Sequence, residues 1–172
     1  MKKISSIIAG LAIVFSASAF TGPGDKAVEE LTSPSRPTVG IVVSNSINAS
    51  LLKDFSTADA ITWKEKEGLY FAYFKVNNND FFAAYSPEGE LLGLSRRLDI
   101  SQLPLKVMQA LSEKMAGYNL ENSVTELIFE GQTNYYLNAE GKTKILQLKC
   151  SPSGDIAVEN RIKKKQLVGS VY

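Results

Sequence analysis

Histidine is absent from the 172 residues of this chain. Its absence removes the usual general base near neutral pH, the commonest nitrogen ligand of metal ions, and every Ser-His or Cys-His nucleophile pair. Carboxylate pairs and Ser-Lys pairs would not need histidine. The acidic residues, however, fall in predicted polar turns, such as Glu67, Glu88 and Glu140, where a carboxylate normally serves solubility. We therefore expect a protein that is not an enzyme, with no catalytic residue, no metal ion and no cofactor.

Cysteine occurs once, as Cys150, so no internal disulfide can form and the hydrophobic core must supply the stability. Cys150 lies in an alternating apolar segment, which predicts a buried small hydrophobic side chain rather than a reactive thiol. The polar run 77–80 is followed at once by Phe81 and Phe82 instead of the further oxygen ligands of a calcium loop. We interpret this run as the tip of a hairpin.

A strong charge of either sign is also lacking. The formal net charge is +1, and removal of Lys2 and Lys3 with a signal peptide changes it to −1. We therefore expect neither nucleic-acid binding nor strong attraction to an anionic membrane. The basic run 163–165 opens a predicted C-terminal tail, 163–172. We interpret the run as the solvated end of the last strand, with a surface-charge contact as the alternative.

The N-terminus has the three parts of a secretory signal. Lys2 and Lys3 precede an apolar run over 4–15, and Ala17-Ser18-Ala19 forms an A-x-A cleavage site. The apolar run is shorter than the ~20 residues that span a bilayer. We predict a signal peptide over 1–19, cleavage between Ala19 and Phe20, and a periplasmic or secreted mature chain with no stable membrane anchor.

Two segments 65 residues apart are almost alike: 85–91 reads YSPEGEL and 150–156 reads CSPSGDI. Each contains Ser-Pro-x-Gly followed by an acidic and an aliphatic residue. Proline presets one turn dihedral and glycine accepts the positive φ that closes the reversal. The repetition predicts that the chain uses one structural unit twice.

Hydrophobic periodicity places the same elements in each copy. The first copy has a predicted helix over 45–56 and period-two strands over 60–66, 69–76, 81–86 and 90–98. The second has a predicted helix from Ser101, as N-cap, to Gly117, and strands over 124–130, 134–138, 142–150 and 155–162. We predict an α+β fold of two tandem repeats, each one helix followed by a four-stranded antiparallel meander sheet. Repeat 1 covers 44–98, repeat 2 covers 99–162, and 20–43 is a linker or N-terminal arm.

The two predicted sheets differ in how many faces are apolar. Alternation in the second sheet gathers one apolar face, formed by Leu127, Phe129, Tyr135, Leu137, Leu146, Leu148, Cys150, Ile156 and Val158. In the first sheet the strand 69–76 is apolar or aromatic on both faces, so both must be covered. The second helix, the N-terminal arm or the junction between the sheets could cover the extra face. Alternatively, that face is an exposed aromatic platform for a protein partner.

Several segments resemble a known family. They are Ile61-Thr62-Trp63-Lys64, the aromatic strand 70–75, the strand and turn 82–89, and Leu103-Pro104 at the start of the second helix. Over 45–162 the chain resembles the PepSY-like, beta-lactamase-inhibitor-like family of secreted proteins common in Bacteroidetes. The second copy lacks a tryptophan at the corresponding place, around 125–127. The resemblance implies tandem helix-plus-four-strand units whose sheets can line a concave face, and some members are inhibitors.

We predict a binding protein rather than a catalyst. The candidate contact residues are Trp63, Phe71, Tyr73, Phe82, Tyr85 and Tyr136, with Lys64, Lys75 and Arg97 as a polar rim. The expected partner is an envelope or extracellular protein, such as a hydrolase whose cleft is occluded, and the chain itself is expected to be a monomer. A small-ligand or envelope-sensing module is one alternative. A structural or assembly role through exposed strand edges is another.

Overall fold

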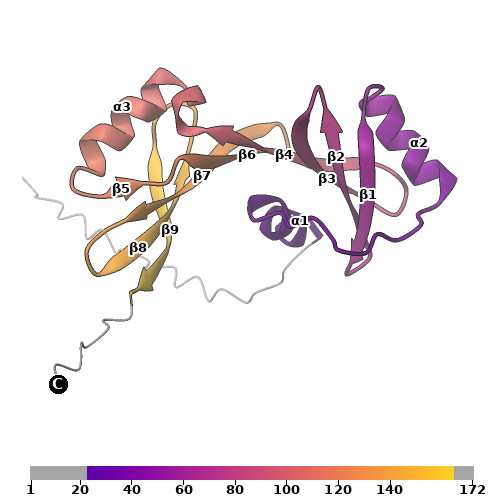
Figure 1. Ribbon diagram of the computed structural model, residues 1–172, viewed down its shortest axis with the longest axis horizontal. Coiled ribbons are helices and arrows are strands. Elements are labelled where there is room, and N and C mark those ends of the chain that lie inside the picture. The colour runs from indigo at the N-terminus through magenta and orange to yellow at the C-terminus, as the bar shows by residue number, and fades with distance from the viewer. Residues whose placement is uncertain (1–22, 165–172) are drawn as a thin grey trace, which may run out of the picture.

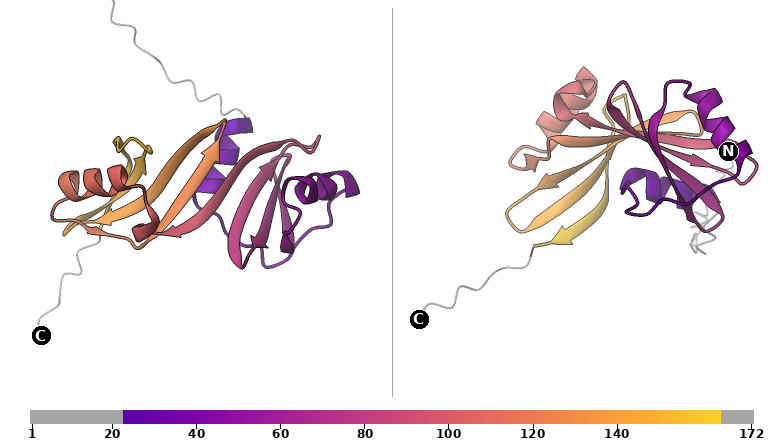
Figure 2. Two further views of the ribbon diagram at one scale, coloured as in Figure 1. Left: turned by 90° about the horizontal axis from the view of Figure 1, so that it is seen from above. Right: turned by 45° about the vertical axis from the view of Figure 1, so that its right-hand side comes forward.

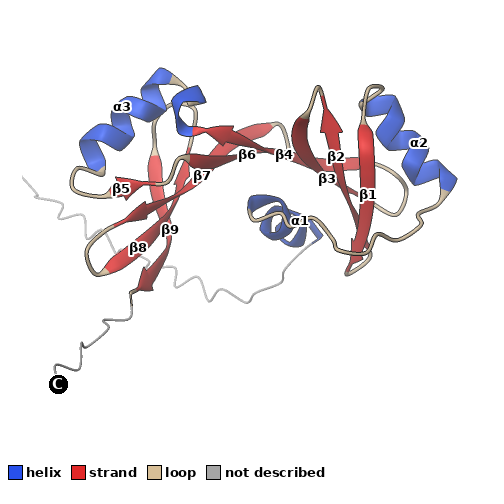
Figure 3. Ribbon diagram, viewed as in Figure 1, coloured by secondary structure: helices blue, strands red, loops and turns tan. Residues whose placement is uncertain are grey.

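The computed structural model describes residues 23–164. Its centre is one antiparallel sheet of nine strands that arches across the whole molecule (Figure 1, Figure 3). Eight strands follow the order β1-β2-β3-β4-β6-β7-β8-β9, and the short β5 pairs with β7. The strands are β1 Asp59–Lys66, β2 Leu69–Val76, β3 Asn79–Tyr85, β4 Leu91–Asp99, β5 Asn119–Leu120, β6 Ser123–Phe129, β7 Gln132–Glu140, β8 Lys144–Cys150 and β9 Ile156–Lys163.

Two helices cover the convex face of the arch, one near each end (Figure 1). They are α2, Asn45–Asp54, and α3, Leu105–Lys114. Each helix buries an i, i+4 pair against the sheet, Ile47 with Leu51 in α2 and Val107 with Leu111 in α3. A separate hydrophobic cluster lies beneath each helix. The apolar spacing in the sequence therefore predicted the presence and the buried faces of both helices, although not all of their ends.

A third helix, α1 (Pro23–Thr32), lies on the concave face under the middle of the arch (Figure 2). It covers a third cluster, whose sheet residues include Phe71, Phe82 and Leu127. The segment predicted as a linker thus contains a packed helix, because Ala27 and Leu31 form an apolar pair one turn apart. Of the two interpretations of the doubly apolar strand, the structure supports coverage of the extra face by the N-terminal arm.

The predicted Ser-Pro-x-Gly turns have matching geometry. In each, the glycine N–H donates to the serine carbonyl at 3.0 Å, and the serine N–H donates at 2.9 Å to the carbonyl of the acidic residue after the glycine. Gly89 and Gly154 have φ values of 84° and 94°. Each glycine also lies against the helix that precedes its strands, Gly89 against α2 and Gly154 against α3. The turn prediction is confirmed at both sites.

The sheet corrects two predictions. We expected two sheets, but β4 and β6 pair directly, from Gly93 opposite Phe129 to Asp99 opposite Ser123. This pairing satisfies the backbone groups that two separate meanders would leave open at their edges. Leu127 and Phe129 were expected on the helix-covered face of the second sheet. They instead pack in the cluster under α1, while Val124 packs in the cluster beneath α3.

The start of the second helix also differs from the prediction. The N-cap is Asp99, which accepts hydrogen bonds from Ser101 N at 2.9 Å and begins a short 3-10 turn, η1 (Ile100–Gln102). Helix α3 starts only after Pro104, whose backbone is extended. Cys150 is fully buried, as expected. Within residues 23–164 no helix is long and apolar enough to cross a membrane. The predicted signal peptide and most of the C-terminal tail lie outside the described residues.

Candidate binding surface on the concave face

The concave face divides into a covered part and an open part. Helix α1 covers the apolar centre, where Leu69 and Phe71 of β2, Ala84 of β3 and Leu127 of β6 are buried. Beyond α1, toward β7 and β8, the same face is polar and contains an open groove. Since the convex face carries α2 and α3, this open part of the concave face is the candidate binding surface.

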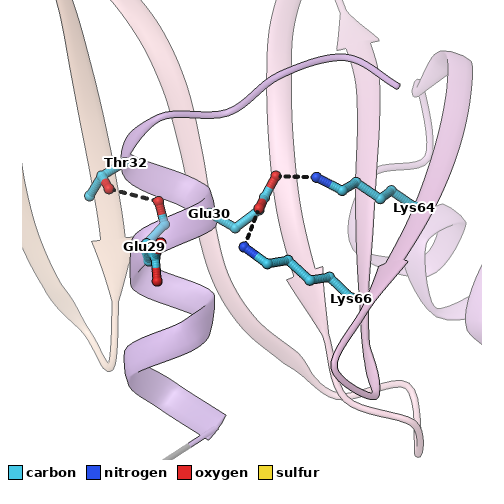
Figure 4. A network of polar contacts seen from close by, with 5 residues as sticks. All are labelled: Glu29, Glu30, Thr32, Lys64 and Lys66. Carbon is cyan, nitrogen blue, oxygen red and sulfur yellow. Dashed lines mark hydrogen bonds and ion pairs between the residues drawn. The ribbon is translucent and has the colours of Figure 1, made fainter. Parts of the chain in front are cut away.

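Helix α1 is held on the sheet by close packing and by ion pairs. Leu31 is buried directly over Gly93 of β4. Glu30 accepts hydrogen bonds from Lys64 Nζ at 2.7 Å and from Lys66 Nζ at 3.1 Å, both on β1 (Figure 4). Burial alone would raise the pKa of Glu30, but the two lysines outweigh it and hold that pKa below its usual value. The carboxylate is therefore ionised at neutral pH and fixes the orientation of α1.

The arm after α1 continues this cover around the edge of the sheet. Pro34 is buried, and the Arg36 guanidinium lies 4.8 Å from the centre of the Tyr73 ring. Ile41 N donates to the Trp63 carbonyl at 3.0 Å, which adds a single bridge to β1. A small apolar cavity beneath the arm has a volume of about 10 Å³, room for roughly one water molecule. The arm thus leaves no space there for a larger ligand.

The six candidate contact residues lie in three different places. Trp63 and Tyr85 are buried beneath α2, where Trp63 Nε1 donates to Asn48 and Tyr85 Oη donates to Asp54 Oδ2 at 3.1 Å. Phe71 and Phe82 are buried on the opposite face beneath α1, each with 8% of its surface exposed. Tyr73 and Tyr136 are half-buried on that concave face. Of the six candidates, these two tyrosines are the ones that remain accessible on the concave face.

The open groove has a volume of about 420 Å³. Its walls come from the C-terminal part of α1 and the residue after it, from strands β4, β6, β7, β8 and β9, and from Glu121. The polar lining residues are Thr32, Ser33, Arg97, Glu121, Ser123, Thr125, Tyr136, Asn138, Gln147, Lys149 and Glu159. Such a mixture of amides, hydroxyls and charges around one tyrosine is suited to hydrogen-bonded recognition, as in the polar parts of protein interfaces.

Sheet register aligns four of these side chains in one row across the strands. Arg97 of β4 is opposite Thr125 of β6, Thr125 is opposite Tyr136 of β7, and Tyr136 is opposite Lys149 of β8. The row ends at Ala157 of β9, opposite Lys149. We call Arg97, Thr125, Tyr136 and Lys149 the transverse row. Two cations thus flank two hydroxyl groups along a single line.

Part of this surface was predicted from the sequence. Tyr136 and Arg97 were candidate residues, while Thr125, Lys149 and the amides were not. Lys149 has the alternating position of an ordinary solvent-facing residue, whereas alternation places Thr125 on the predicted inner face with Leu127, so neither position indicates a contact surface. Among the described residues, 23–164, no group of three Asp, Glu or Cys side chains is placed to hold a metal ion.

No family model and no curated protein matches the chain. Solved structures do match. A BLIP-like protein from Bacteroides fragilis NCTC 9343 aligns with a TM-score of 0.64 and 22% identity, covering 75% of this chain and 93% of that one. A DUF2874 family protein from Bacteroides uniformis ATCC 8492 aligns with a TM-score of 0.62 and 20% identity, covering 71% of this chain and 90% of that one. A predicted periplasmic protein from Bacteroides eggerthii DSM 20697 aligns with a TM-score of 0.62 and 20% identity, covering 72% of this chain and 90% of that one.

At these identities the likeness establishes the fold alone. This fold agrees with the resemblance of the sequence to the PepSY-like, beta-lactamase-inhibitor-like family. The chain therefore has the α+β, large antiparallel-sheet fold of the BLIP-like proteins.

Proposed function

We propose that this chain is an exported, non-enzymatic protein that binds a protein partner through the open groove of the concave face. The observation that supports it most directly is the polar groove of about 420 Å³ beside α1, whose lining includes the half-buried Tyr136. Tyrosine surrounded by hydrogen-bonding groups is a common anchor at protein interfaces. The partner is an envelope or extracellular protein, and occlusion of an enzyme cleft is the proposed mode of action.

Two further features support the proposal. The N-terminal sequence has the three parts predicted for a cleaved secretory signal, which would deliver the chain to the envelope. The absence of histidine from the whole chain argues against most hydrolytic mechanisms. The partner, rather than this chain, would then carry any chemistry.

The scaffold is proposed to consist of two copies of one unit. The two Ser-Pro-x-Gly turns have the same hydrogen bonds, and each packs against its own preceding helix. Pairing of β4 with β6 would join the copies into one curved sheet. The concave face would then be a product of the duplication, with α1 covering its first half.

The test is site-specific photo-crosslinking with the mature chain from Phe20 onward. A photoreactive amino acid replaces Gln147, an exposed residue that lines the groove. The matched control replaces Gln109, an exposed residue of α3 on the convex side. Each protein is irradiated with an envelope fraction of the source cell, and adducts are identified by mass spectrometry.

A specific adduct from position 147 that is absent from position 109 would support the proposal and identify the partner. If that partner is an enzyme, its activity should fall when the unmodified chain is added. Adducts from position 109 alone, or none from either position, would contradict binding through the groove.

A further inference from the structure

The side chains of the two cations of the transverse row, Arg97 and Lys149, have no partner among the described residues. Neither side chain has a hydrogen bond or an ion pair with any residue in the described range 23–164. The lysines on the first half of the concave face, by contrast, each form an ion pair. Lys64 and Lys66 bind Glu30, and Lys75 binds Asp80 at 3.0 Å. The chain thus neutralises its own lysines beside α1 and leaves two positive charges open in the groove.

The spacing of the row sets the size of a matching ligand. Arg97 and Lys149 are three strand positions apart, so their Cα atoms are separated by about 14 Å. In an extended peptide, residues i and i+4 are about 13 Å apart and point to the same side. Two carboxylates at that spacing could therefore reach both cations at once, with residue i+2 above Thr125 and Tyr136.

We propose that the partner presents an extended acidic segment, with carboxylates four residues apart, which lies along the transverse row. This inference rests on the proposed function, since it names the part of the partner that enters the groove. Arg97 and Lys149 bind the two carboxylates. The Thr125 and Tyr136 hydroxyls donate to the peptide or carboxylate oxygens between them. Burial and the nearby Glu159 raise the pKa of Tyr136, so its hydroxyl remains a donor at neutral pH.

Two carboxylates in the groove, Glu121 and Glu159, disfavour ligands with a continuous negative charge. Glu121 accepts a hydrogen bond from Asn138 Nδ2 at 2.8 Å, and Glu159 lies on β9, beyond Lys149. Neither is a member of the row. A uniformly charged polyanion or an anionic membrane would meet both of them and be repelled. Discrete carboxylates placed at the two cations would not.

A selection from a random peptide library displayed on phage tests this inference. The mature chain serves as bait, and enriched peptides are sequenced and synthesised. Two double variants are compared with it. The groove variant is Arg97→Glu with Lys149→Glu, and the control is Lys53→Glu with Lys106→Glu, two exposed residues of α2 and α3 with the same change in charge.

Enriched peptides should contain pairs of Asp or Glu four residues apart. Their affinity should fall about tenfold or more in the groove variant, because each exposed ion pair is replaced by a repulsion, and should change less than twofold in the control. Added salt should weaken binding to the mature chain. Circular dichroism of both variants checks that they are folded.

Enriched peptides without acidic pairs, or with equal affinity for the groove variant, would overturn the inference. Failure to enrich any peptide would also count against it, since an extended segment is the proposed ligand. The proposed function is tested separately by the adduct at position 147. An adduct there with a partner whose affinity survives both charge reversals would retain the groove as the binding site and reject the acidic segment.

Discussion

Leu31 of α1 lies directly over Gly93 of β4. A Cβ atom added to Gly93 would be 2.8 Å from Leu31 Cδ1 and 2.9 Å from Phe129 Cδ2, closer than real Cβ contacts. Only a residue without a side chain lets α1 approach the sheet this closely at that point. The glycine therefore decides how the N-terminal helix fits on the concave face.

Gly93→Ala should destabilise the protein by about 1–3 kcal/mol, because overpacking forces Leu31 and α1 away from the sheet. Leu31→Ala alone should cost about 2–5 kcal/mol through the lost contacts and the cavity left behind. Urea denaturation of both single variants and the double variant measures their coupling. The double variant should lose clearly less than the sum of the two, since the clash is relieved. Additive losses would mean that Leu31 and Gly93 do not interact as described.

Acid should weaken the attachment of α1 through Glu30. The pKa of Glu30 is lowered in the folded protein, so its contribution is fully present above its unfolded pKa of ~4.3 and is lost as pH falls through the folded value. Glu30→Gln should reduce the free energy of unfolding at pH 7 by about 1 kcal/mol, with the partly exposed lysines limiting the effect. It should also make that free energy less dependent on pH below 5.

The control for this effect is Glu29→Gln, an exposed neighbour on the same helix. Its pH profile should match that of the unmodified protein. Equal pH profiles for the Glu30 and Glu29 variants would show that the lysine pair does not stabilise α1.

Phe71→Ala and Tyr73→Ala should differ in stability. Phe71 is buried under α1, so its truncation should cost about 3–5 kcal/mol. Tyr73 is half-buried, with Arg36 over its ring and Phe82 at 4.4 Å between ring centres, so its truncation should cost less, about 1–2 kcal/mol. Chemical denaturation of both variants checks the order. A near-neutral Phe71→Ala would mean that α1 does not cover this residue in solution.

The turn glycines should respond unequally to alanine. At Gly154 the new methyl would be 2.9 Å from the Lys106 carbonyl, which belongs to the backbone of α3. At Gly89 it would meet the Ser50 hydroxyl, which can rotate away. Gly131 has a positive φ but open space, so Gly131→Ala isolates the backbone strain of about 1–2 kcal/mol. Thermal denaturation should rank the losses Gly154→Ala, then Gly89→Ala, then Gly131→Ala.

Cys150 should be unreactive until the protein unfolds. It is fully buried, and burial raises the pKa of its thiol to about 11. Labelling with a thiol-reactive chromogenic disulfide at pH 8 should be negligible in buffer and should reach one thiol per chain in denaturant. Rapid labelling in buffer would contradict the burial of β8 beneath α3.

The local elements were largely predictable, because each has its own signal in the sequence. Period-two alternation and the two Ser-Pro-x-Gly turns specified the strands, and the pairs Ile47 with Leu51 and Val107 with Leu111 specified two helices. Helix α1 was missed because Pro34 and nearby glycines resemble a linker, although Ala27 and Leu31 have helical spacing. A helix of this length is marginal on its own and depends on the sheet beneath it.

The candidate site was less predictable, because it depends on pairing between distant strands. Alternation shows that Phe71 and Phe74 lie on opposite faces, but not which of them α1 covers. Alternation puts Thr125 on the predicted inner face with Leu127 and makes Lys149 look like an ordinary solvent-facing residue, until the register places both beside Tyr136. The charges of Lys64 and Lys149 look equivalent in the sequence. Only the position of Glu30 distinguishes the paired lysine from the open one.

Because β4 pairs directly with β6, each half of the sheet needs the other half to satisfy the backbone hydrogen bonds of its inner edge strand. Separation after Asp99 would leave one fragment with β4 as a bare edge and the other with β6 as a bare edge, each a template for aggregation. It would also divide the transverse row, since Arg97 belongs to one fragment and Lys149 to the other. The curvature of the sheet, the transverse row and the protection of its edges therefore all require both halves, and no single half would retain them.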